Sequence, residues 1–220
     1  MKHTIRCILF DVDGTLVDTW RLYIEAYIRT FEPHFERRVT LPELINLRPT
    51  SEIRMLHRLL GAEAPETHQR FLQHYRVLHP SLFGGVYTGV EMMLNELRRQ
   101  QIGLGIVTGK SRGAWEITRQ AVDLGCFDVA VYDDDVEEEK PAPEGILLAL
   151  KRLELTVDEV VYIGDSPKDA LAAAAAGVRF GAALWPKEEE CAVFLDEVRQ
   201  IGVWAELSGP EALITHLRDT

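Results

Sequence analysis

Paired cysteines and long apolar runs are both scarce in this sequence. Three cysteines occur among 220 residues, far apart and never with CxxC spacing. This pattern argues against a disulfide framework and favours reduced thiols in a cytoplasmic protein. The N-terminus is too short and too charged for a signal peptide, and no run approaches the roughly 20 apolar residues of a membrane-crossing helix. We therefore expect a cytoplasmic protein without a membrane partner.

Positive charge is also in deficit. Lys and Arg total 24 against 35 Asp and Glu, which gives a formal net charge of -11 at pH 7. A surface of that sign repels polyanions, so we expect no nucleic-acid partner. Hydrophobic residues make up 46% of the chain, enough for a packed core. What remains is a globular protein, a monomer or a homodimer, that can hold a small anion in a local cationic pocket.

The spacing of apolar residues divides the chain into an α/β part and an all-helical insertion. A short β-rich run at 5–10 predicts a buried strand, and helical periodicity then fills 18–79 without any strand pattern. From residue 90 onward, helices alternate with strands, which indicates βαβ units. The fold class is therefore α/β: a Rossmann-like, mostly parallel sheet flanked by helices, with a small all-helical cap inserted after the first strand.

The expected domains are a core of residues 1–16 and 84–220 and a cap of residues 17–83. The linkers near 16–18 and 83–89 are expected to act as hinges that let the cap close over the core. The expected strands are 5–10, 102–107, 129–132, 160–163, 178–184 and 203–207. The expected helices are 18–31, 41–47, 51–60, 66–79, 90–101, 112–124, 143–153, 168–176 and 189–200.

Two carboxylates follow the first strand, at the end where parallel sheets bind their ligands. Asp11 and Asp13 are two residues apart, so on an extended chain their side chains point the same way. Two neighbouring anions in a partly buried place are costly unless a hard cation such as Mg2+ lies between them. Asp165, at another strand end, could complete that site. The alternative is a pair of loop carboxylates that cap a turn, but the following glycine and the preceding apolar strand favour the cation site.

Other strand ends carry polar residues whose meaning is open from the residues alone. Thr108 precedes a helix whose N-terminus suits a phosphate, although an ordinary N-cap explains this threonine equally well. Lys140 either neutralises charge at the site or balances the acidic run 133–139, which we interpret as a solvated loop. Asp165 and Asp169 open a helix, and capping that helix is compatible with binding a metal.

Together these segments resemble the haloacid dehalogenase superfamily of phosphatases. The matching segments are Asp11-Val12-Asp13-Gly14-Thr15, Val107-Thr108-Gly109-Lys110, Lys140-Pro141-Ala142-Pro143 and Gly164-Asp165-Ser166-Pro167-Lys168-Asp169. The resemblance spans nearly the whole chain, and the first and last segments are highly specific. Within the superfamily, the phrases LVDT, KPAPEGI and GDSPKDALAAAAAG are typical of the phosphoglycolate phosphatase group.

The resemblance implies a role for each of these polar residues. Asp11 would attack phosphorus and form an aspartyl-phosphate, and Asp13 would protonate the leaving alkoxide and then deprotonate the attacking water. Thr108 and the amide of Gly109 would bind the transferring phosphoryl group, while Lys140 would steady that group and the nucleophile. Dehalogenases of this fold lack an acid–base Asp two residues after the nucleophile, so Asp13 favours phosphate chemistry.

The cofactor that the resemblance implies is Mg2+. One oxygen of Asp11, the backbone carbonyl of Asp13 and the carboxylate of Asp165 would hold the ion, with Asp169 supporting that shell. Phosphoryl transfer depends mainly on positioning and charge neutralisation, which such a set of residues can supply.

Two positions depart from the pattern of the group. Gly109 stands where many phosphoglycolate phosphatases have Asn, which loosens the expected specificity. With Thr108 and Gly109, Lys110 is expected at the substrate. In the cap, Arg48 occupies a region where relatives place a Gly-containing specificity loop. It either binds a substrate carboxylate bidentately or is an exposed residue at a helix start.

The leading hypothesis is a Mg2+-dependent phosphomonoesterase of a small anionic metabolite, with 2-phosphoglycolate as the first candidate. The alternative is a pyrophosphatase, or a nucleotide or sugar-phosphate phosphatase, because cap loops alone separate these activities. A phosphoglucomutase would need a cap that holds a bisphosphate intermediate, and no clear signal of one is present. A hypothesis of another class is a non-catalytic phospho-ligand sensor, against which stands the full set of catalytic residue types.

Overall fold

The computed structural model describes residues 5–47, 51–187 and 191–219, and it confirms the predicted α/β fold with a helical insertion. A six-stranded sheet has the order β5-β4-β1-β6-β7-β8, so β1 lies near its centre. All neighbouring strands in it are parallel. The strands are β1 (Cys7–Phe10), β4 (Gly103–Val107), β5 (Val129–Val131), β6 (Val160–Gly164), β7 (Arg179–Ala183) and β8 (Ala205–Leu207).

Alternation of side chains along β1 builds an apolar core on each face of the sheet. Ile8 and Phe10 belong to one apolar cluster, whereas Cys7 and Leu9 belong to the other, as the two-residue period of a strand requires. All four side chains are essentially inaccessible to solvent. Because β1 is buried on both sides, the residues that follow it are held in a fixed position.

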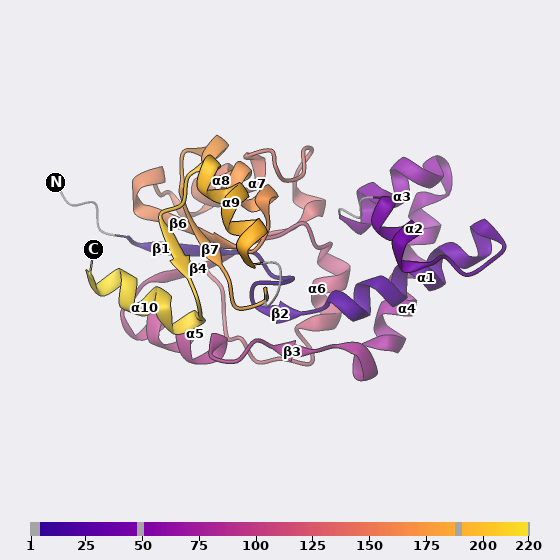
Figure 1. The fold of residues 1–220 in the computed structure, drawn as a ribbon, viewed down its shortest axis with the longest axis horizontal. Coiled ribbons are helices and arrows are strands. Elements are labelled where there is room, and N and C mark those ends of the chain that lie inside the picture. Colours follow the sequence, from indigo (N-terminus) through magenta and orange to yellow (C-terminus); the bar gives the residue numbers. More distant parts are fainter. Residues whose placement is uncertain (1–4, 48–50, 188–190, 220) are drawn as a thin grey trace.

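Helices cover both faces of the sheet. They are α5 (Val90–Arg99), α6 (Arg112–Thr118), α7 (Glu144–Leu153), α8 (Pro167–Ala176), α9 (Cys191–Ile201) and α10 (Pro210–Asp219), with 3-10 turns η2 (Asp133–Asp135) and η3 (Val157–Glu159). α5 and α10 cover one face, and α7, α8 and α9 cover the other (Figure 1). This is the layered arrangement that the alternation of strand and helix predicts.

The helical insertion forms a second lobe beside the sheet (Figure 1). Its helices are α1 (Trp20–Phe35), α2 (Leu41–Asn46), α3 (Glu52–Leu60) and α4 (Ala64–Leu82), with the 3-10 turn η1 (Gly61–Glu63) between the last two. They share an apolar cluster of their own, in which the ring centroids of Tyr27 and Phe71 lie 4.9 Å apart. Ala114 and Ile117 of α6 belong to the same cluster, so α6 is the core helix against which the cap packs.

A two-stranded antiparallel ribbon joins the two lobes. β2 (Val17–Asp18) pairs with β3 (Gly85–Val86), and the amide of Gly84 donates to the carbonyl of Asp18 at 2.9 Å. Gly84 permits this approach, because a Cβ there would overlap the Asp18 side chain. The two expected linkers thus run side by side. Their action as hinges stays a prediction, as does the division into separate core and cap domains.

The two largest differences from the expected helices concern α6 and α10. α6 ends at Thr118 rather than at residue 124, because Arg98 of α5 donates to the carbonyl oxygens of Leu124 and Cys126 and holds that segment in a non-helical path. α10 has no counterpart among the expected helices. Its buried Leu213 joins the apolar cluster of the sheet, so its helical pattern becomes clear only once α5 and β8 are packed beside it.

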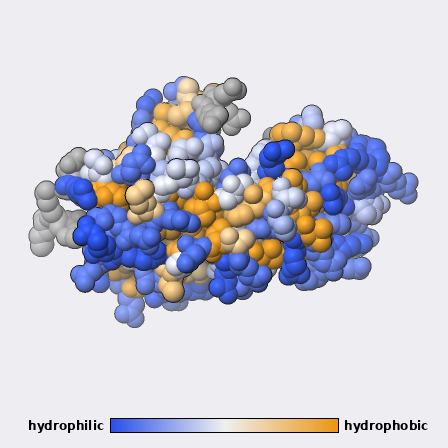
Figure 2. Space-filling view, turned by 90° about the horizontal axis from the view of Figure 1, so that it is seen from below, coloured by the Kyte–Doolittle hydropathy of each residue, from blue (hydrophilic) through white to orange (hydrophobic). Residues whose placement is uncertain are grey.

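The surface is hydrophilic toward both ends of the molecule, while hydrophobic residues gather toward the middle of the face in Figure 2. The exposed apolar side chains include Trp20 and Leu41, which line a groove of the cap together with Leu78. Among the described residues, no helix is both long and apolar enough to cross a membrane.

Candidate active site

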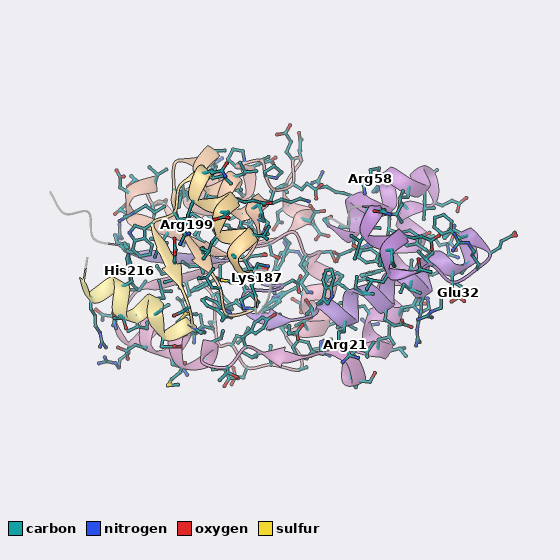
Figure 3. The ribbon with its side chains drawn as sticks, in the orientation of Figure 1. Arg21, Glu32, Arg58, Lys187, Arg199 and His216 are labelled. Carbon is teal, nitrogen blue, oxygen red and sulfur yellow. The ribbon has the colours of Figure 1, made fainter. Side chains whose placement is uncertain are left out.

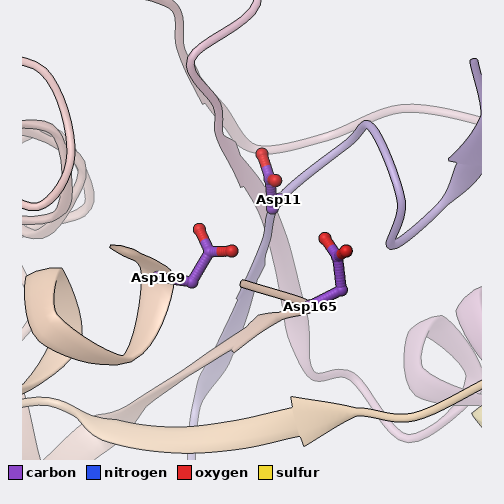
Figure 4. A group of neighbouring side chains, drawn as sticks. All are labelled: Asp11, Asp165 and Asp169. Atoms are coloured by element: carbon purple, nitrogen blue, oxygen red, sulfur yellow. The ribbon is translucent and has the colours of Figure 1, made fainter. Parts of the chain in front are cut away.

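Three carboxylates meet at the C-terminal edge of the central strands (Figure 4). Asp11 follows β1, Asp165 follows β6 and Asp169 stands in the first turn of α8. One carboxylate oxygen from each lies within 4.8 Å of the others. They converge because β1 and β6 are parallel neighbours that end at the same edge of the sheet. The fold therefore brings together three of the four aspartates that the sequence assigns to the metal.

Asp11 has the environment of a reactive carboxylate. Its Oδ1 is buried and accepts no hydrogen bond within the described part of the chain, although Lys140 Nζ lies 3.1 Å away. Burial, opposed by Lys140 and reinforced by the neighbouring aspartates, raises the pKa of Asp11 to about 7. The sheet holds this residue in place, since its backbone amide donates to the carbonyl of Ile163 at 2.9 Å. A buried oxygen without a hydrogen bond is costly, which points to a functional reason for it.

Lys140 is a mostly enclosed cation of this site. Its ammonium donates to Asp169 Oδ1 at 2.5 Å and to the Tyr162 hydroxyl at 3.0 Å, besides contacting Asp11. Burial works to lower the pKa of Lys140, but Asp11 and Asp169 outweigh that effect and raise the pKa well above its usual value. The interpretation of Lys140 as a solvated partner of the acidic run is therefore wrong, because this charged side chain is only 14% exposed.

Asp169 acts on the site through its neighbours. Its Oδ2 accepts hydrogen bonds from the amide and the hydroxyl of Ser166, the residue that caps α8. Its Oδ1 accepts from Lys140 and from the Tyr162 hydroxyl. Burial works to raise the pKa of Asp169, but Lys140 and these hydrogen bonds prevail and lower it. With both oxygens engaged, Asp169 holds Lys140 beside Asp11.

Asp165 is held from several sides. Thr15 donates to its Oδ1 at 3.2 Å, and Lys187, in the core near its junction with the cap, donates to its Oδ2 at 3.1 Å (Figure 3). Burial raises the pKa of Asp165 despite the nearby lysine. Gly14 lies against the same carboxylate, since its φ is +79° and a Cβ there would be 2.6 Å from Asp165 Oδ2. Both the left-handed backbone and this close approach therefore require glycine.

Gly14→Ala should damage the carboxylate site more than the fold. The added Cβ displaces Asp165 besides straining the backbone, so we expect the Mg2+ concentration for half-maximal activity to rise about tenfold or more. Gly177→Ala is the matched control, because φ there is +73° and nothing lies within 4 Å of a Cβ. It should cost only about 1 kcal/mol and leave the Mg2+ response unchanged. Thermal unfolding and Mg2+ titrations measure both effects, and equal Mg2+ responses in the two variants would contradict the prediction.

The Asp13 carboxylate is anchored on the side of the cap. Its Oδ1 accepts from the Thr19 hydroxyl at 2.6 Å and from Lys110 Nζ at 2.8 Å. The side chain is 27% exposed, so it can reach a ligand while anchored through one oxygen. Asp11 and Asp13 thus have different partners, because β1 ends at Phe10 and a turn follows. Metal binding through the backbone carbonyl of Asp13 stays a prediction.

Thr108 and Gly109 follow β4. Thr108 is buried, and its hydroxyl oxygen accepts from the Lys110 amide at 3.2 Å. The N-cap of α6 is Ser111, whose hydroxyl accepts from the Ala114 amide at 3.1 Å, so the interpretation of Thr108 as the cap is wrong. No atom lies within 4 Å of the place that a Cβ would take at Gly109, which leaves its backbone approachable. Contact of these two residues with a phosphoryl group stays a prediction.

The acidic run 133–139 is only in part the solvated loop that its composition predicts: Asp134, Glu137 and Glu138 are exposed, but Asp133 is buried. Asp133 is 3% exposed, Arg54 of α3 contacts its Oδ1 at 2.9 Å, and the Ser51 hydroxyl donates to its Oδ2 at 2.5 Å. Arg54 also donates to two backbone carbonyl oxygens of the run, at 2.7 and 2.6 Å. The run therefore contacts the start of α3 and forms a further attachment between cap and core, besides the ribbon and α6.

Arg54→Ala should weaken this attachment. The change leaves Asp133 buried without its cation, so we expect the free energy of unfolding to fall by about 1–3 kcal/mol and KM to rise as contact between cap and core becomes less favoured. The matched control is Arg37→Ala, which removes an exposed, solvent-screened ion pair with Glu43 inside the cap and should leave both stability and KM nearly unchanged. Denaturant unfolding and steady-state kinetics test this, and the prediction is wrong if the two variants behave alike.

Several side chains at the site carry no clear signal in the sequence. Thr19 and Tyr23 follow the first motif closely, and a register for the helix that begins there could have suggested them. Tyr75 and Lys187 come from distant segments and are recognised only in the packed structure. Arg48 lies outside the described residues, so its contact with the substrate stays a prediction.

The group formed by Asp11, Asp165 and Asp169 fits a hard divalent cation. Carboxylate oxygens are the ligands that Mg2+ prefers in proteins, and one oxygen of Asp11 is buried without a hydrogen bond. Burial raises the pKa of both Asp11 and Asp165, and a bound cation would counter that effect. These donors therefore suit the ion that the sequence implies.

A Rossmann-like sheet, a helical insertion after β1 and an aspartate cluster that contacts Lys140 define the class of protein. The chain belongs to the haloacid dehalogenase-like hydrolases, whose family pattern matches residues 8–183. The predicted resemblance is confirmed, and the protein is a phosphatase of that family.

The chain is similar to proteins with several different names. Pyrophosphatase PpaX of Bacillus pumilus is 32% identical over 197 residues, covering 88% of this chain and 89% of its own. CbbY from Rhodobacter sphaeroides, solved in complex with phosphate, has a TM-score of 0.79 at 25% identity and covers 98% of this chain and 100% of its own. A mutant of CbbY is solved with xylulose-(1,5)bisphosphate. A candidate phosphoglycolate phosphatase from Lactobacillus plantarum shares the fold, with a TM-score of 0.78 at 21% identity and coverage of 97% and 99%.

Proposed function

We propose that this protein is a Mg2+-dependent phosphomonoesterase that transfers the phosphoryl group of a small anionic metabolite to Asp11 and then to water. The observation that carries the proposal is the buried Oδ1 of Asp11, which lacks a hydrogen bond among the described residues and has charged Lys140 at 3.1 Å. Such an oxygen is a nucleophile held beside a cation that attracts the phosphoryl group. The first candidate substrate is 2-phosphoglycolate.

Asp11 and Asp165 would hold the Mg2+ ion, together with the backbone carbonyl of Asp13. The ion supplies neutralisation of the charge on the phosphoryl oxygens. Asp169 would serve the site through Lys140, because both of its oxygens already accept hydrogen bonds. The Mg2+ ion and Lys140 would together supply the positive charge that phosphoryl transfer requires around the reacting group.

In the first half-reaction, a carboxylate oxygen of Asp11 attacks phosphorus in line with the leaving oxygen. The bond from Asp11 to phosphorus forms as the bond to the leaving oxygen breaks, and protonated Asp13 gives its proton to that oxygen. Lys140 holds the Asp11 carboxylate in place and balances the charge on the phosphoryl group. The Thr108 hydroxyl and the Gly109 amide would bind the same phosphoryl oxygens.

In the second half-reaction, ionised Asp13 takes a proton from a water molecule, whose oxygen attacks the phosphorus of the aspartyl-phosphate. The bond to Asp11 breaks, inorganic phosphate leaves and the carboxylate is restored. Asp13 can serve both steps because Thr19 and Lys110 hold its Oδ1, while its Oδ2 has no hydrogen bond from the described residues. The attached cap would keep other water away during the first step.

Purified protein with Mg2+ and a panel of phosphate compounds tests the proposal. The panel holds 2-phosphoglycolate, pyrophosphate, a nucleotide, a sugar phosphate and p-nitrophenyl phosphate. We expect phosphate release that EDTA abolishes and added Mg2+ restores. The proposal is wrong if no ester is turned over, or if EDTA has no effect. Mg2+-dependent binding of a phosphate compound without release of phosphate would support the phospho-ligand sensor instead.

Hydrolysis of pyrophosphate is the second candidate function. It is supported by the relative named pyrophosphatase PpaX, which is 32% identical over 88% of this chain. In that reaction the leaving group is itself a phosphate, so its departure depends less on a proton from Asp13. The ratio of kcat/KM for pyrophosphate to that for 2-phosphoglycolate decides between the two. Conversion of a sugar phosphate to its isomer, without net phosphate release, would indicate a mutase.

A further inference from the structure

Lys110 lies fully buried between the core and the cap, although the sequence assigns it to the substrate. Its side chain has no exposed area. Its Nζ donates to Asp13 Oδ1 at 2.8 Å, to the Tyr75 hydroxyl at 2.9 Å and to the Tyr23 hydroxyl at 3.0 Å. An ammonium group has three N–H donors, so these three acceptors use all of them. Lys110 therefore has no donor left for a substrate in this arrangement.

The acceptors of Lys110 come from both lobes. Tyr23 belongs to α1 and Tyr75 to α4, whereas Asp13 follows the central strand of the core. The ammonium also lies over the two tyrosine rings, 4.4 Å from the centroid of Tyr23 and 4.9 Å from that of Tyr75. The Tyr75 hydroxyl in turn pairs with the Thr118 hydroxyl of α6 at 2.9 Å. One lysine thus connects the acid–base carboxylate to two cap helices.

This connection depends on where the cap lies. Burying an ammonium is costly unless its donors are satisfied, and the cap supplies two of the three acceptors of Lys110. Movement of the cap away from the core would remove the Tyr23 and Tyr75 hydroxyls and admit water. Lys110 would then be free to leave Asp13. The position of the cap and the orientation of Asp13 are therefore linked through a single side chain.

We propose that Lys110 is a positioning residue that holds the Asp13 carboxylate in its working orientation only while the cap lies on the core. The proposal rests on the proposed function of Asp13 as acid and base. Lys110 and Thr19 both bind Oδ1, so Oδ2 is the oxygen that exchanges the proton with the leaving group and with water. Closure of the cap over a substrate thereby also readies the acid–base group.

The test compares leaving groups that differ in their need for a proton. An alkyl phosphate such as 2-phosphoglycolate needs protonation of its leaving alkoxide, whereas p-nitrophenyl phosphate does not. For both substrates, kcat/KM depends only on the steps up to and including formation of the phosphoenzyme. We expect Lys110→Met to lower kcat/KM about 100-fold for the alkyl phosphate and about threefold or less for p-nitrophenyl phosphate, in keeping with the size of general-acid effects.

A second variant keeps the lysine and both aromatic rings. The double change Tyr23→Phe and Tyr75→Phe removes only the two cap hydroxyls, so it should shift the alkyl-to-aryl ratio in the same direction, by about tenfold. If Lys110→Met does not fold, this double variant still tests whether the cap positions Asp13 through Lys110. Lys151→Met, at an exposed position of α7, is the control for loss of a lysine and should leave the ratio unchanged.

Three results would overturn the proposal. A parallel fall for both substrates would mean that Lys110 only supports the packing of the two lobes. A rise in KM for both substrates with kcat unchanged would mean that Lys110 binds the phosphate compound itself. If the wild type turns over no ester, the proposed function itself fails, and hydrogen exchange then tests whether Lys110 holds the cap on the core.

In that experiment, Lys110→Met must speed amide exchange at residues 19–23 relative to Lys151→Met. Equal exchange in the two variants would mean that Lys110 does not hold the cap.

Discussion

Asp11→Asn should abolish phosphate release while the fold remains intact. Asparagine has nearly the same shape as aspartate but cannot form the acyl-phosphate bond, so we expect kcat to fall by at least about 10,000-fold. The measurement is single-turnover and steady-state release of phosphate with Mg2+ present, on protein whose circular dichroism matches the wild type. A residual rate within about tenfold of the wild type would show that another group receives the phosphoryl.

The same variant should be more stable than the wild type when Mg2+ is removed. The pKa of Asp11 is about 7 in the folded protein against an ordinary value of 3.8, because of burial. The unfolded chain therefore loses the proton at lower pH than the folded chain, and the wild type is progressively destabilised as the pH rises from about 4 to about 7. Asparagine does not titrate and avoids this loss.

A pair of thermal scans in EDTA measures the effect. The melting temperature of Asp11→Asn should exceed that of the wild type by more at about pH 8 than at about pH 5, since the carboxylate of the wild type is ionised in both states at the higher pH. A gain that is equal at the two values, or larger at the lower one, would contradict burial of an ionised carboxylate as its cause. The nucleophile thus reduces the stability of the metal-free protein.

Lys140→Met should lose both activity and stability, which is the opposite effect on stability from Asp11→Asn. Methionine is of similar length but uncharged, so Asp11 and Asp169 remain buried without the cation that contacts them at 3.1 and 2.5 Å. We expect the free energy of unfolding to fall by about 3–5 kcal/mol. The loss of charge opposite the phosphoryl group should lower kcat by about 100- to 1,000-fold.

Lys151→Met is the matched control for this prediction as well, because it removes an exposed lysine from α7 and should change the free energy of unfolding by less than about 0.5 kcal/mol. Adding Asp169→Asn to Lys140→Met removes one of the two buried carboxylates that have lost their cation. The double variant should recover part of the stability, but not the activity. Denaturant unfolding of the wild type, Lys140→Met, Lys151→Met and the double variant measures these changes in stability. If Lys140→Met is as stable as the control, the ion pairs contribute little.

The α/β architecture and the positions of the carboxylates could be predicted from the sequence, because they follow from patterns among residues that are near one another in the chain. The apolar run before Asp11 needs only the two-residue period of a buried strand, and alternating helices and strands impose a parallel sheet with its ligands at one edge. Asp11 and Asp165 then meet because their strands are neighbours. The cap also follows from a continuous helical period between the first strand and the rest of the sheet.

The errors share one physical origin. The acidic run 133–139 predicts a solvated loop if each charge is taken with its neighbours in sequence, yet Arg54 of the cap buries Asp133. The same reasoning leaves Lys140 open between a solvated residue and a residue of the site, whereas Asp11 and Asp169 enclose it. Charges pair with whatever the packed chain brings near, and those partners lie many residues away. Composition alone therefore misjudges the solvation of charged residues in a folded protein.

Local sequence thus specifies which residue types stand at the end of β1 and β6, and with them the family and the kind of chemistry. Tertiary packing decides how two similar carboxylates differ. Asp11 faces Lys140 and the other aspartates of the core, while Asp13 is anchored by Thr19 and Lys110. The reason is physical: alternation along a strand depends on adjacent residues, but burial and ion pairing depend on distant segments that meet only in the folded chain.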